Sequence, residues 1–327
     1  MSQNQITRVA VLGLGTMGHG IALSYARAGC RVVGFDANAD ARQSLPARVR
    51  QVLRDFVDFE LVKADEVELI LGRISVVDDE ALAVRDAEFV VEAISENLAD
   101  KQSLFERIEA AVAPETILAS NSSTFPISQS GARLRQPERA VVTHWFNPPH
   151  IVPTVEVVPS VQTNERTIAA TIDLLRRAGK LAIRIHQELP GFLVNRVQIA
   201  VMREVWDLLD RGVASAADID AAIRGSMGFR LAALGPLQIH DFGGLDIQTL
   251  VFRNLAPEIR SDTAIPATVQ KIVDAGHLGF KTGSGFYDYP HPDQTRSDRD
   301  RRYLQLLRLL HHAPDQSFNR KQSNERE

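Results

Sequence analysis

Short apolar runs alternate with longer amphipathic segments between residues 8 and 185. This alternation is typical of βαβ units on a parallel sheet. The apolar runs predict strands at residues 8–12, 31–35, 73–77, 88–93, 116–119, 139–143, 155–158 and 181–185. The clearest helical patterns between them lie at residues 16–28, 97–112 and 165–178. We therefore expect an α/β fold with a doubly wound, mainly parallel sheet.

The pattern changes at Pro190 and Gly191. After this point apolar positions recur at helical spacing, which predicts helices at residues 194–211, 217–224 and 266–275. Near the C-terminus the composition turns polar, although leucines recur at helical spacing between residues 301 and 311, and the chain from Pro314 onward is expected to be disordered. The predicted organisation is a sheet domain (1–188), an all-helical domain (189–289) and a polar tail with a short helix (290–327).

The composition is that of an ordinary globular protein and excludes several classes of function. The net charge of the 327 residues is −4, without the basic footprint of a nucleic-acid-binding protein. No apolar segment approaches the ~20 residues that cross a bilayer. The polar N-terminus does not resemble a signal peptide, and the single cysteine, Cys30, fits a reducing cytoplasm. The histidines show no metal-binding spacing, so no metal site is expected.

A glycine-rich turn follows the first predicted strand. The segment Gly-Leu-Gly-Thr-Met-Gly, which begins at Gly13, is a G-x-G-x-x-G pattern between a strand and a helix. Gly13 allows the tight turn, Gly15 lets a pyrophosphate approach the backbone, and Gly18 lets the helix pack close to the sheet. The helix N-terminus then faces the anion. The motif predicts a Rossmann-type dinucleotide site, to which Thr16 and Met17 also belong.

Asp36 selects the cofactor. It ends the second predicted strand, where a carboxylate hydrogen-bonds the adenosine ribose hydroxyls. A basic residue directly after it would favour NADP, but Ala37 and Asn38 follow. NAD is the predicted cofactor.

A histidine and a glutamate form the candidate catalytic pair. His144 follows an apolar strand, at the end where open α/β sheets meet their ligands. Glu156 lies in an otherwise apolar run, where a carboxylate is costly unless it is paired. A paired glutamate would hold the imidazole in one tautomer while His144 removes a hydroxyl proton before hydride transfer. A buried pair with a purely structural role is the alternative, and spacing alone leaves both open.

Further segments carry a family resemblance. The chain resembles the L-3-hydroxyacyl-CoA dehydrogenase family from Val9 to Tyr289, through GLGTMG, VEAISENLADKQSLF, SNSST, HWFNP, VEVV, PGFLVNR and FKTGSGFYDY. The resemblance implies an NAD-dependent enzyme that reversibly oxidises an (S)-3-hydroxyacyl-CoA to the 3-ketoacyl-CoA, a reaction of fatty-acid metabolism. It also implies a homodimer formed through the helical domain.

The resemblance assigns roles by position. It implies that His144 is the general base and that Glu156 orients it. Ser123 and Asn195 match residues that hold the substrate oxygen and the histidine region, and Asn147 is a further substrate candidate. The positions matching the nicotinamide half of the cofactor site are Glu96, Lys101, Asn121 and Lys281. Several of these residues also have an explanation without a functional role. Glu96 and Lys101 could be solvated charges at the start of a helix. Asn195 could be a polar group on a helix face, and Lys281 an ordinary lysine in a loop.

Three departures from the family concern the substrate. In the relatives that use CoA, a serine and several lysines after the ribose aspartate contact CoA, whereas Val52 and Phe59 occupy those places here. Arginines at 48, 50 and 54 offer positive charge nearby. The loop at residues 148–153 is similar to that of enzymes acting on small carboxylates, L-gulonate 3-dehydrogenase (lambda-crystallin) and, most closely, a pyridine-carboxylate dehydrogenase.

The third departure is a longer loop at residues 227–236. It places Arg230 where gulonate and carnitine dehydrogenases also have an arginine. A guanidinium can clamp a free carboxylate with two hydrogen bonds, although a surface ion pair would explain it equally well. The sequence thus leaves a CoA thioester and a free hydroxy carboxylate as alternative substrates. A non-catalytic NAD-binding structural protein is disfavoured because His144 and Glu156 are both present.

Overall fold

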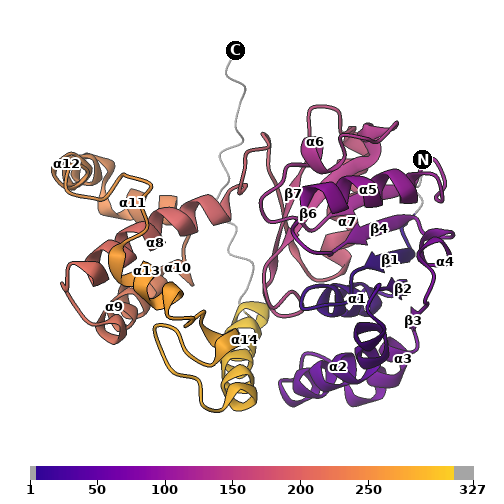
Figure 1. Ribbon diagram of the computed structural model, residues 1–327, viewed down its shortest axis with the longest axis horizontal. Helices are drawn as coiled ribbons and strands as arrows, with labels where there is room; N and C mark the ends of the chain where they lie inside the picture. The colour runs from indigo at the N-terminus through magenta and orange to yellow at the C-terminus, as the bar shows by residue number, and fades with distance from the viewer. Residues whose placement is uncertain (1–4, 313–327) are drawn as a thin grey trace. The chain divides into compact units, whose positions relative to one another are not determined.

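The computed structural model describes residues 5–312, which fold into two compact units (Figure 1). Unit 1 runs to Leu193 and takes up the chain again from Ser297, and unit 2 is Val194–Arg296. The chain therefore passes between the units twice. The first passage lies shortly after the predicted boundary at residue 188. The disorder expected from Pro314 onward lies outside the described residues.

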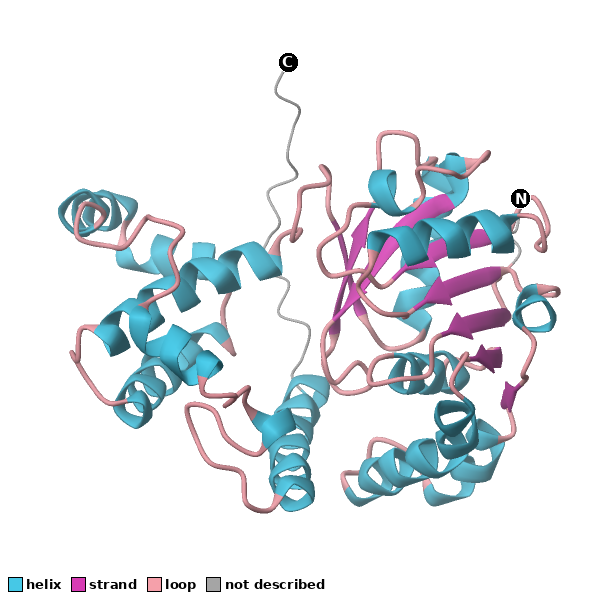
Figure 2. Ribbon diagram, in the orientation of Figure 1, coloured by secondary structure: helices cyan, strands magenta, loops and turns pink. Residues whose placement is uncertain are grey.

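Unit 1 is built on one eight-stranded sheet (Figure 2). The strands are β1 (Arg8–Leu12), β2 (Arg31–Phe35), β3 (Ile74–Val76), β4 (Phe89–Glu92), β5 (Ile117–Ser120), β6 (Ala140–Trp145), β7 (Thr154–Val158) and β8 (Leu181–Arg184). Their order is β3-β2-β1-β4-β5-β6-β7-β8, and within this sheet β6 and β7 pair antiparallel while the other neighbours are parallel. The predicted doubly wound, mainly parallel sheet is confirmed, with small shifts at the strand ends.

Helices connect the strands of unit 1. They are α1 (Gly18–Arg27), α2 (Ala39–Asp58), α3 (Val67–Leu71), α4 (Glu80–Val84), α5 (Leu98–Glu109), α6 (Ile127–Ser130) and α7 (Glu165–Arg177). Asparagine side chains begin three of them: Asn38 accepts from the Asp40 N–H, Asn97 from Asp100 and Asn164 from Thr167. These caps satisfy N–H groups that have no partner inside the helix, so the sequence determines where the helices start.

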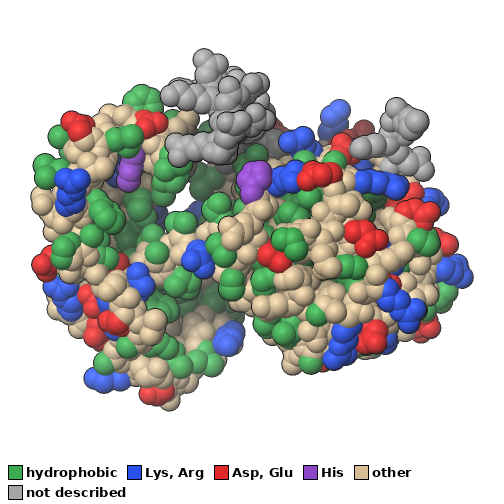
Figure 3. All heavy atoms as spheres, turned by 90° about the horizontal axis from the view of Figure 1, so that it is seen from above, with side chains coloured by type: hydrophobic (Ala, Val, Ile, Leu, Met, Phe, Trp, Pro, Cys, Tyr) green, Lys and Arg blue, Asp and Glu red, His purple; other side chains and the backbone are tan. Residues whose placement is uncertain are grey.

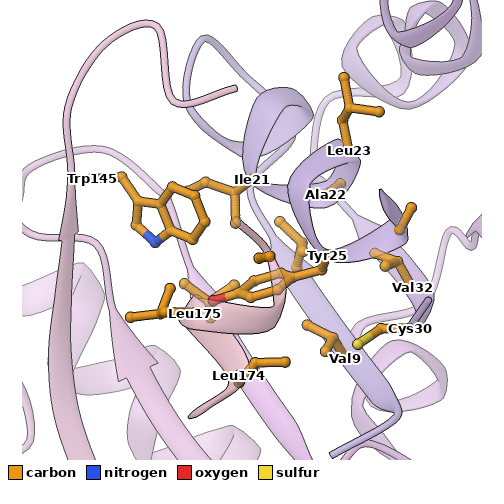
Figure 4. Close-up of a cluster of buried hydrophobic side chains, with 14 of the residues drawn as sticks. Val9, Ile21, Ala22, Leu23, Tyr25, Cys30, Val32, Trp145, Leu174 and Leu175 are labelled. Atoms are coloured by element: carbon orange, nitrogen blue, oxygen red, sulfur yellow. The ribbon is translucent and has the colours of Figure 1, made fainter. Parts of the chain in front are cut away.

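The buried core holds α1 against the sheet (Figure 4). Tyr25 on α1 packs edge-on against Trp145 on β6, with 5.5 Å between ring centroids. Both rings are fully buried, and aromatic pairs of this geometry stabilise beyond their buried area. The helix that begins at the glycine turn and the strand that carries His144 are therefore fixed in one core.

The polar C-terminal segment forms one long helix, α14 (Pro292–His312), where the sequence predicts only a short one. Leu304 and Leu307, on one face of this helix, belong to the core of unit 1. Arg308 forms an ion pair with Glu60 just after α2, at 2.6 Å. The prediction of a separate polar tail is therefore wrong for these residues, because two buried leucines anchor an otherwise polar helix.

Unit 2 is helical, as predicted. It contains α8 (Val194–Asp210), α9 (Ala216–Ile223), α10 (Phe229–Leu231), α11 (Pro236–Gly243), α12 (Leu245–Leu255) and α13 (Ala267–Asp274). Ser215 caps α9 by accepting from the Asp218 N–H. Many apolar side chains of this unit are exposed, and Figure 3 shows them as green spheres on its surface.

Within residues 5–312, no helix is both long and apolar enough to span a membrane. In the same part of the chain, no group of histidine, cysteine and acidic side chains could hold a metal ion.

Candidate functional site

The glycine turn lies between β1 and α1, and the surroundings of its three glycines differ. Gly13 has a φ of +93°, and a Cβ there would lie 2.6 Å from the carbonyl oxygen of Ala93. A Cβ on Gly18 would lie 1.7 Å from the carbonyl oxygen of Gly13. Gly15 differs, because no heavy atom lies within 4 Å of where its Cβ would be. The turn is thus tightly packed on the protein side and open at Gly15, which leaves room for a pyrophosphate at the start of α1.

Asp36 lies at the end of β2, beside this turn. Its Oδ2 accepts a hydrogen bond from the Leu14 N–H at 2.6 Å, and its Oδ1 accepts one from the Asn38 N–H at 2.8 Å. An ionised carboxylate oxygen can accept two hydrogen bonds, so each oxygen keeps one position for a ribose hydroxyl. The residues present therefore fit the adenosine half of NAD.

His144 and Glu156 are brought together by the one antiparallel pairing of the sheet. They are direct partners in the register of β6 and β7, and His144 Nδ1 lies 2.7 Å from Glu156 Oε2. Both side chains are buried. Since a carboxylate only accepts, we assign the proton between them to Nδ1, which leaves Nε2 of His144 as the basic nitrogen.

Apolar rings and a backbone donor complete the surroundings of this pair. The His144 ring lies 4.5 Å from the Phe146 ring and 5.3 Å from the Phe192 ring, measured between centroids. The Leu193 N–H donates to Glu156 Oε1 at 3.2 Å. Both glutamate oxygens are thus hydrogen-bonded, which offsets the cost of burying the charge.

Lys101 is paired with a residue that the sequence analysis did not select. It is only 1% exposed, and its Nζ lies 2.8 and 2.9 Å from the two carboxylate oxygens of Glu92 at the end of β4. Ser120 also donates to Glu92. The alternative of a solvated lysine is therefore wrong. The sequence holds a signal for Glu92, because it is a carboxylate in an apolar strand, as Glu156 is, and such a carboxylate needs a partner.

Glu96 holds the turn that carries Ser123. Its Oε2 lies 3.4 Å from Lys101 Nζ, and its Oε1 accepts from the Ser123 N–H at 2.9 Å. The same oxygen accepts from the Ser122 hydroxyl and from the N–H and hydroxyl of Thr124. Burial raises the pKa of Glu96, but the hydroxyl donors and the Lys101 charge outweigh it, so the pKa lies below its usual value. Glu96 therefore keeps its charge and fixes the backbone of this turn.

Asn121 connects the same turn to the catalytic strand. Its Oδ1 accepts from the Trp145 N–H at 3.0 Å, and its own N–H donates to the Glu92 carbonyl. Because β4, β5 and β6 are parallel, their carboxyl ends share one edge of the sheet. Unit 1 therefore collects at this edge the predicted residues Gly13, Asp36, Glu96, Lys101, Asn121, Ser123, His144, Asn147 and Glu156.

The loop after His144 encloses a second buried histidine. His150 lies near His19 and Phe56, with 5.5 and 6.1 Å between its ring centroid and theirs. Burial, reinforced by the positive charges nearby, lowers the pKa of His150 to about 3. Lys180 donates to the carbonyls of Pro149 and Val152, and burial lowers its pKa to about 7. This buried histidine is therefore neutral.

Three predicted residues belong to unit 2. Asn195 lies in the first turn of α8, and Lys281 is exposed in a short 3-10 helix, Phe280–Thr282. Arg230 is exposed on α10, and its Nε donates to the Ser226 carbonyl at 3.4 Å. It forms no ion pair with a carboxylate among the described residues, so the alternative of a surface ion pair finds no support.

Comparisons with known proteins cover both units. Residues 8–189 match the model of the NAD-binding domain of 3-hydroxyacyl-CoA dehydrogenase, and residues 191–289 match that of its C-terminal domain. The chain is 34% identical over 310 residues to 5-formyl-3-hydroxy-2-methylpyridine 4-carboxylate 5-dehydrogenase of Mesorhizobium japonicum, covering 93% of this chain and 98% of that one. It is 34% identical over 286 residues to a probable 3-hydroxybutyryl-CoA dehydrogenase of Bacillus subtilis, covering 87% and 98%.

A solved structure agrees with the first of these relatives. A crystal structure of 5-formyl-3-hydroxy-2-methylpyridine 4-carboxylic acid 5-dehydrogenase, described as an NAD⁺-dependent dismutase, superposes with a TM-score of 0.88. The two chains share 32% identity, and the match covers 95% of this chain and all of that one.

Proposed function

The chain belongs to the 3-hydroxyacyl-CoA dehydrogenase family, as an NAD-dependent oxidoreductase of CH–OH groups, and we propose that its substrate is a small free hydroxy carboxylate. The observation that carries this proposal is the position of α14. The family resemblance implies CoA contacts at positions 52 and 59 of α2 and its end. Here Arg308 of α14 is ion-paired to Glu60, beside position 59. A helix of the chain itself thus occupies the end of α2.

In the proposed mechanism His144 acts as the general base. When bound, NAD supplies the acceptor for the hydride that leaves the hydroxyl-bearing carbon. Nε2 of His144 takes the hydroxyl proton, so that the alcohol loses a hydride and a proton and becomes a carbonyl group. Glu156 stabilises the imidazolium formed in this step, because its carboxylate already accepts the Nδ1 proton.

The remaining residues position the substrate in this proposal. Ser123 and Asn195 hold the substrate oxygen, as the resemblance implies, and Asn147 contributes from the loop after β6. Glu96, Asn121, Lys101 and Lys281 serve the nicotinamide half of the site. For Lys101 we propose an indirect role through Glu96, since its ammonium group is buried between two carboxylates. Arg230 clamps the substrate carboxylate, for which its exposed guanidinium has free donors.

The test is NADH formation from small hydroxy carboxylates and (S)-3-hydroxybutyryl-CoA in parallel. We expect kcat/KM to be at least about a hundredfold higher for a free acid than for the thioester. A free acid pairs its carboxylate with Arg230, whereas the thioester leaves this interaction unmade. Arg230→Ala should raise KM for the acid and leave thioester turnover unchanged. Arg253→Ala, an exposed arginine on α12, is the control. Preference for the thioester would overturn the proposal.

A CoA thioester is the second candidate, and the likeness to the Bacillus subtilis 3-hydroxybutyryl-CoA dehydrogenase favours it. It would place the protein in fatty-acid metabolism with the same roles for His144 and Glu156. The parallel assay described above separates the two candidates directly.

We further propose a cytoplasmic homodimer formed through unit 2. Phe229, Leu237, Phe242 and Phe252 are all more than two-thirds exposed on α10, α11 and α12. Apolar surface of this extent is uncommon on monomers, and a second copy would bury it. The cytoplasmic location is supported by Cys30, which is a free thiol.

The dimer is tested by light scattering. The measured mass should be twice the chain mass, and Phe252→Asp should shift the measured mass toward that of the monomer. A monomeric wild type would refute the dimer.

A further inference from the structure

Arg48 lies on α2, outside the glycine motif, yet its guanidinium contacts the glycine turn. Nη2 donates to the Leu14 carbonyl at 2.7 Å and to the Ala41 carbonyl at 3.0 Å, and Nη1 donates to the Gly15 carbonyl at 3.3 Å. From the sequence alone, Arg48 is only a positive charge near the positions expected to contact CoA. Two of its nitrogens, Nη1 and Nη2, instead donate to the backbone of the glycine turn.

His19 is a second side chain that contacts the Gly15 carbonyl. His19 Nδ1 lies 3.0 Å from the Gly15 oxygen. Burial and the Arg48 charge keep the pKa of His19 below its usual value, so a neutral imidazole that donates from Nδ1 fits this contact. The Gly15 carbonyl is thus held from two elements, α2 and the start of α1.

These contacts decide where the N–H groups of the turn point. In a planar trans peptide the C=O of one residue and the N–H of the next point in opposite directions. Holding the Leu14 oxygen therefore turns the Gly15 N–H away from Arg48, and holding the Gly15 oxygen does the same for the Thr16 N–H. Within the described residues neither N–H donates to another group, and both residues are exposed.

We propose that Arg48 is a positioning residue for the cofactor: by holding the Leu14 and Gly15 carbonyls, it aims the Gly15 and Thr16 N–H groups at the pyrophosphate. The contribution is largest for an anion, because a hydrogen bond to an ionised oxygen is roughly twice as strong as one to a neutral oxygen. The inference rests on the NAD dependence of the chain and not on which hydroxyl substrate it oxidises.

The experiment measures binding without turnover, so that its outcome is independent of the substrate proposal. NADH, ADP and adenosine are titrated against Arg48→Met, which keeps the apolar stem and removes the donors. We expect the Kd of NADH and of ADP to rise about tenfold, the equivalent of one charge-assisted hydrogen bond, with adenosine binding unchanged. In steady state the KM for NAD should rise while kcat at saturating NAD stays within about twofold.

Arg50→Met is the matched control. Arg50 lies two positions along α2 and pairs with Glu68 on the surface, so its removal takes the same charge from the helix without touching the turn. Equal losses for ADP and adenosine would mean that Arg48 only supports the fold, and unchanged ADP binding would also overturn the proposal. If Arg48→Met does not fold, Arg48→Lys, which keeps the charge but cannot reach several carbonyls at once, must show the same selective loss for ADP.

Discussion

His144 on β6 and Glu156 on β7 stand directly opposite each other, with 2.7 Å between Nδ1 and Oε2, because these two strands run antiparallel. An antiparallel pair places opposite side chains on the same face at close range. In a sheet whose other neighbours are parallel, this single reversal gives the pair its geometry.

Replacing the base tests this geometry. His144→Ala should lower kcat by about 10²–10⁴-fold, because general base catalysis contributes that much, and Glu156→Gln should lower it less. NADH binding, followed by fluorescence titration, should be nearly unchanged in both variants. Near-normal turnover of His144→Ala would remove this residue from the mechanism.

Asp36→Ser should weaken NAD far more than NADP. The variant loses the carboxylate that accepts from the ribose hydroxyls, which we expect to raise the Kd of NAD by about tenfold or more. Titration of both cofactors checks this, with Asp40→Ser, an exposed acid in the first turn of α2, as the control. Equal loss for both cofactors would contradict the assignment.

Breaking the Glu92–Lys101 pair should destabilise unit 1. Lys101→Met leaves a buried carboxylate without its partner, which costs about 3–5 kcal/mol, and the double variant Glu92→Gln/Lys101→Met should recover part of this loss. Urea denaturation measures both. Arg107→Gln, which breaks the exposed pair with Glu80, should cost about 1 kcal/mol or less. If Lys101→Met is no worse than this control, the pair is not buried in solution.

The neutral state of His150 makes stability depend on pH. In the folded protein the pKa of His150 is about 3, against an ordinary value of 6.5, so between these pH values the unfolded chain binds a proton that the folded chain does not. Its contribution is therefore complete above pH 6.5 and is lost as the pH falls toward 3, with a slope of up to about 1.4 kcal/mol per pH unit.

The pH dependence is measured by urea denaturation at several pH values between about 4 and 7. His150→Gln should flatten it, whereas His277→Gln, a change at an exposed histidine, should not. The same slope in His150→Gln as in the wild type would exclude His150 as its source. The groups around His150 are His19, Lys180, Arg27 and Arg299, and a positive charge on any of them lowers the pKa of His150 further.

The attachment of α14 to unit 1 can be tested with two leucines on one helix. Leu304 is 1% exposed and Leu306 is 51% exposed. Leu304→Ala should cost about 2–5 kcal/mol, because it opens a cavity in the core, whereas Leu306→Ala should change the free energy of unfolding by about 0.5 kcal/mol or less. Equal effects would show that α14 does not pack as described.

Local patterns predict the strands, several of the helices and much of the site. The strands, the glycine turn and Asp36 were all predicted, because periodicity, caps and turn chemistry are encoded within a few neighbouring residues. The pairing of His144 with Glu156 was also expected, since a carboxylate in an apolar strand needs a partner. That β6 and β7 are neighbours in the sheet, and that they run antiparallel, does not follow from the sequence.

Only the tertiary structure decided which distant groups meet. Glu92 as the partner of Lys101, Arg48 on the glycine turn and Leu304 in the core of unit 1 all depend on which elements adjoin in the fold. A side chain's own sequence neighbourhood carries no information on the element that packs against it from elsewhere in the chain. The sequence by itself therefore determined the dehydrogenase family and its cofactor, whereas the position of α14 beside the end of α2, on which the proposal of a free carboxylate rests, came only from the tertiary structure.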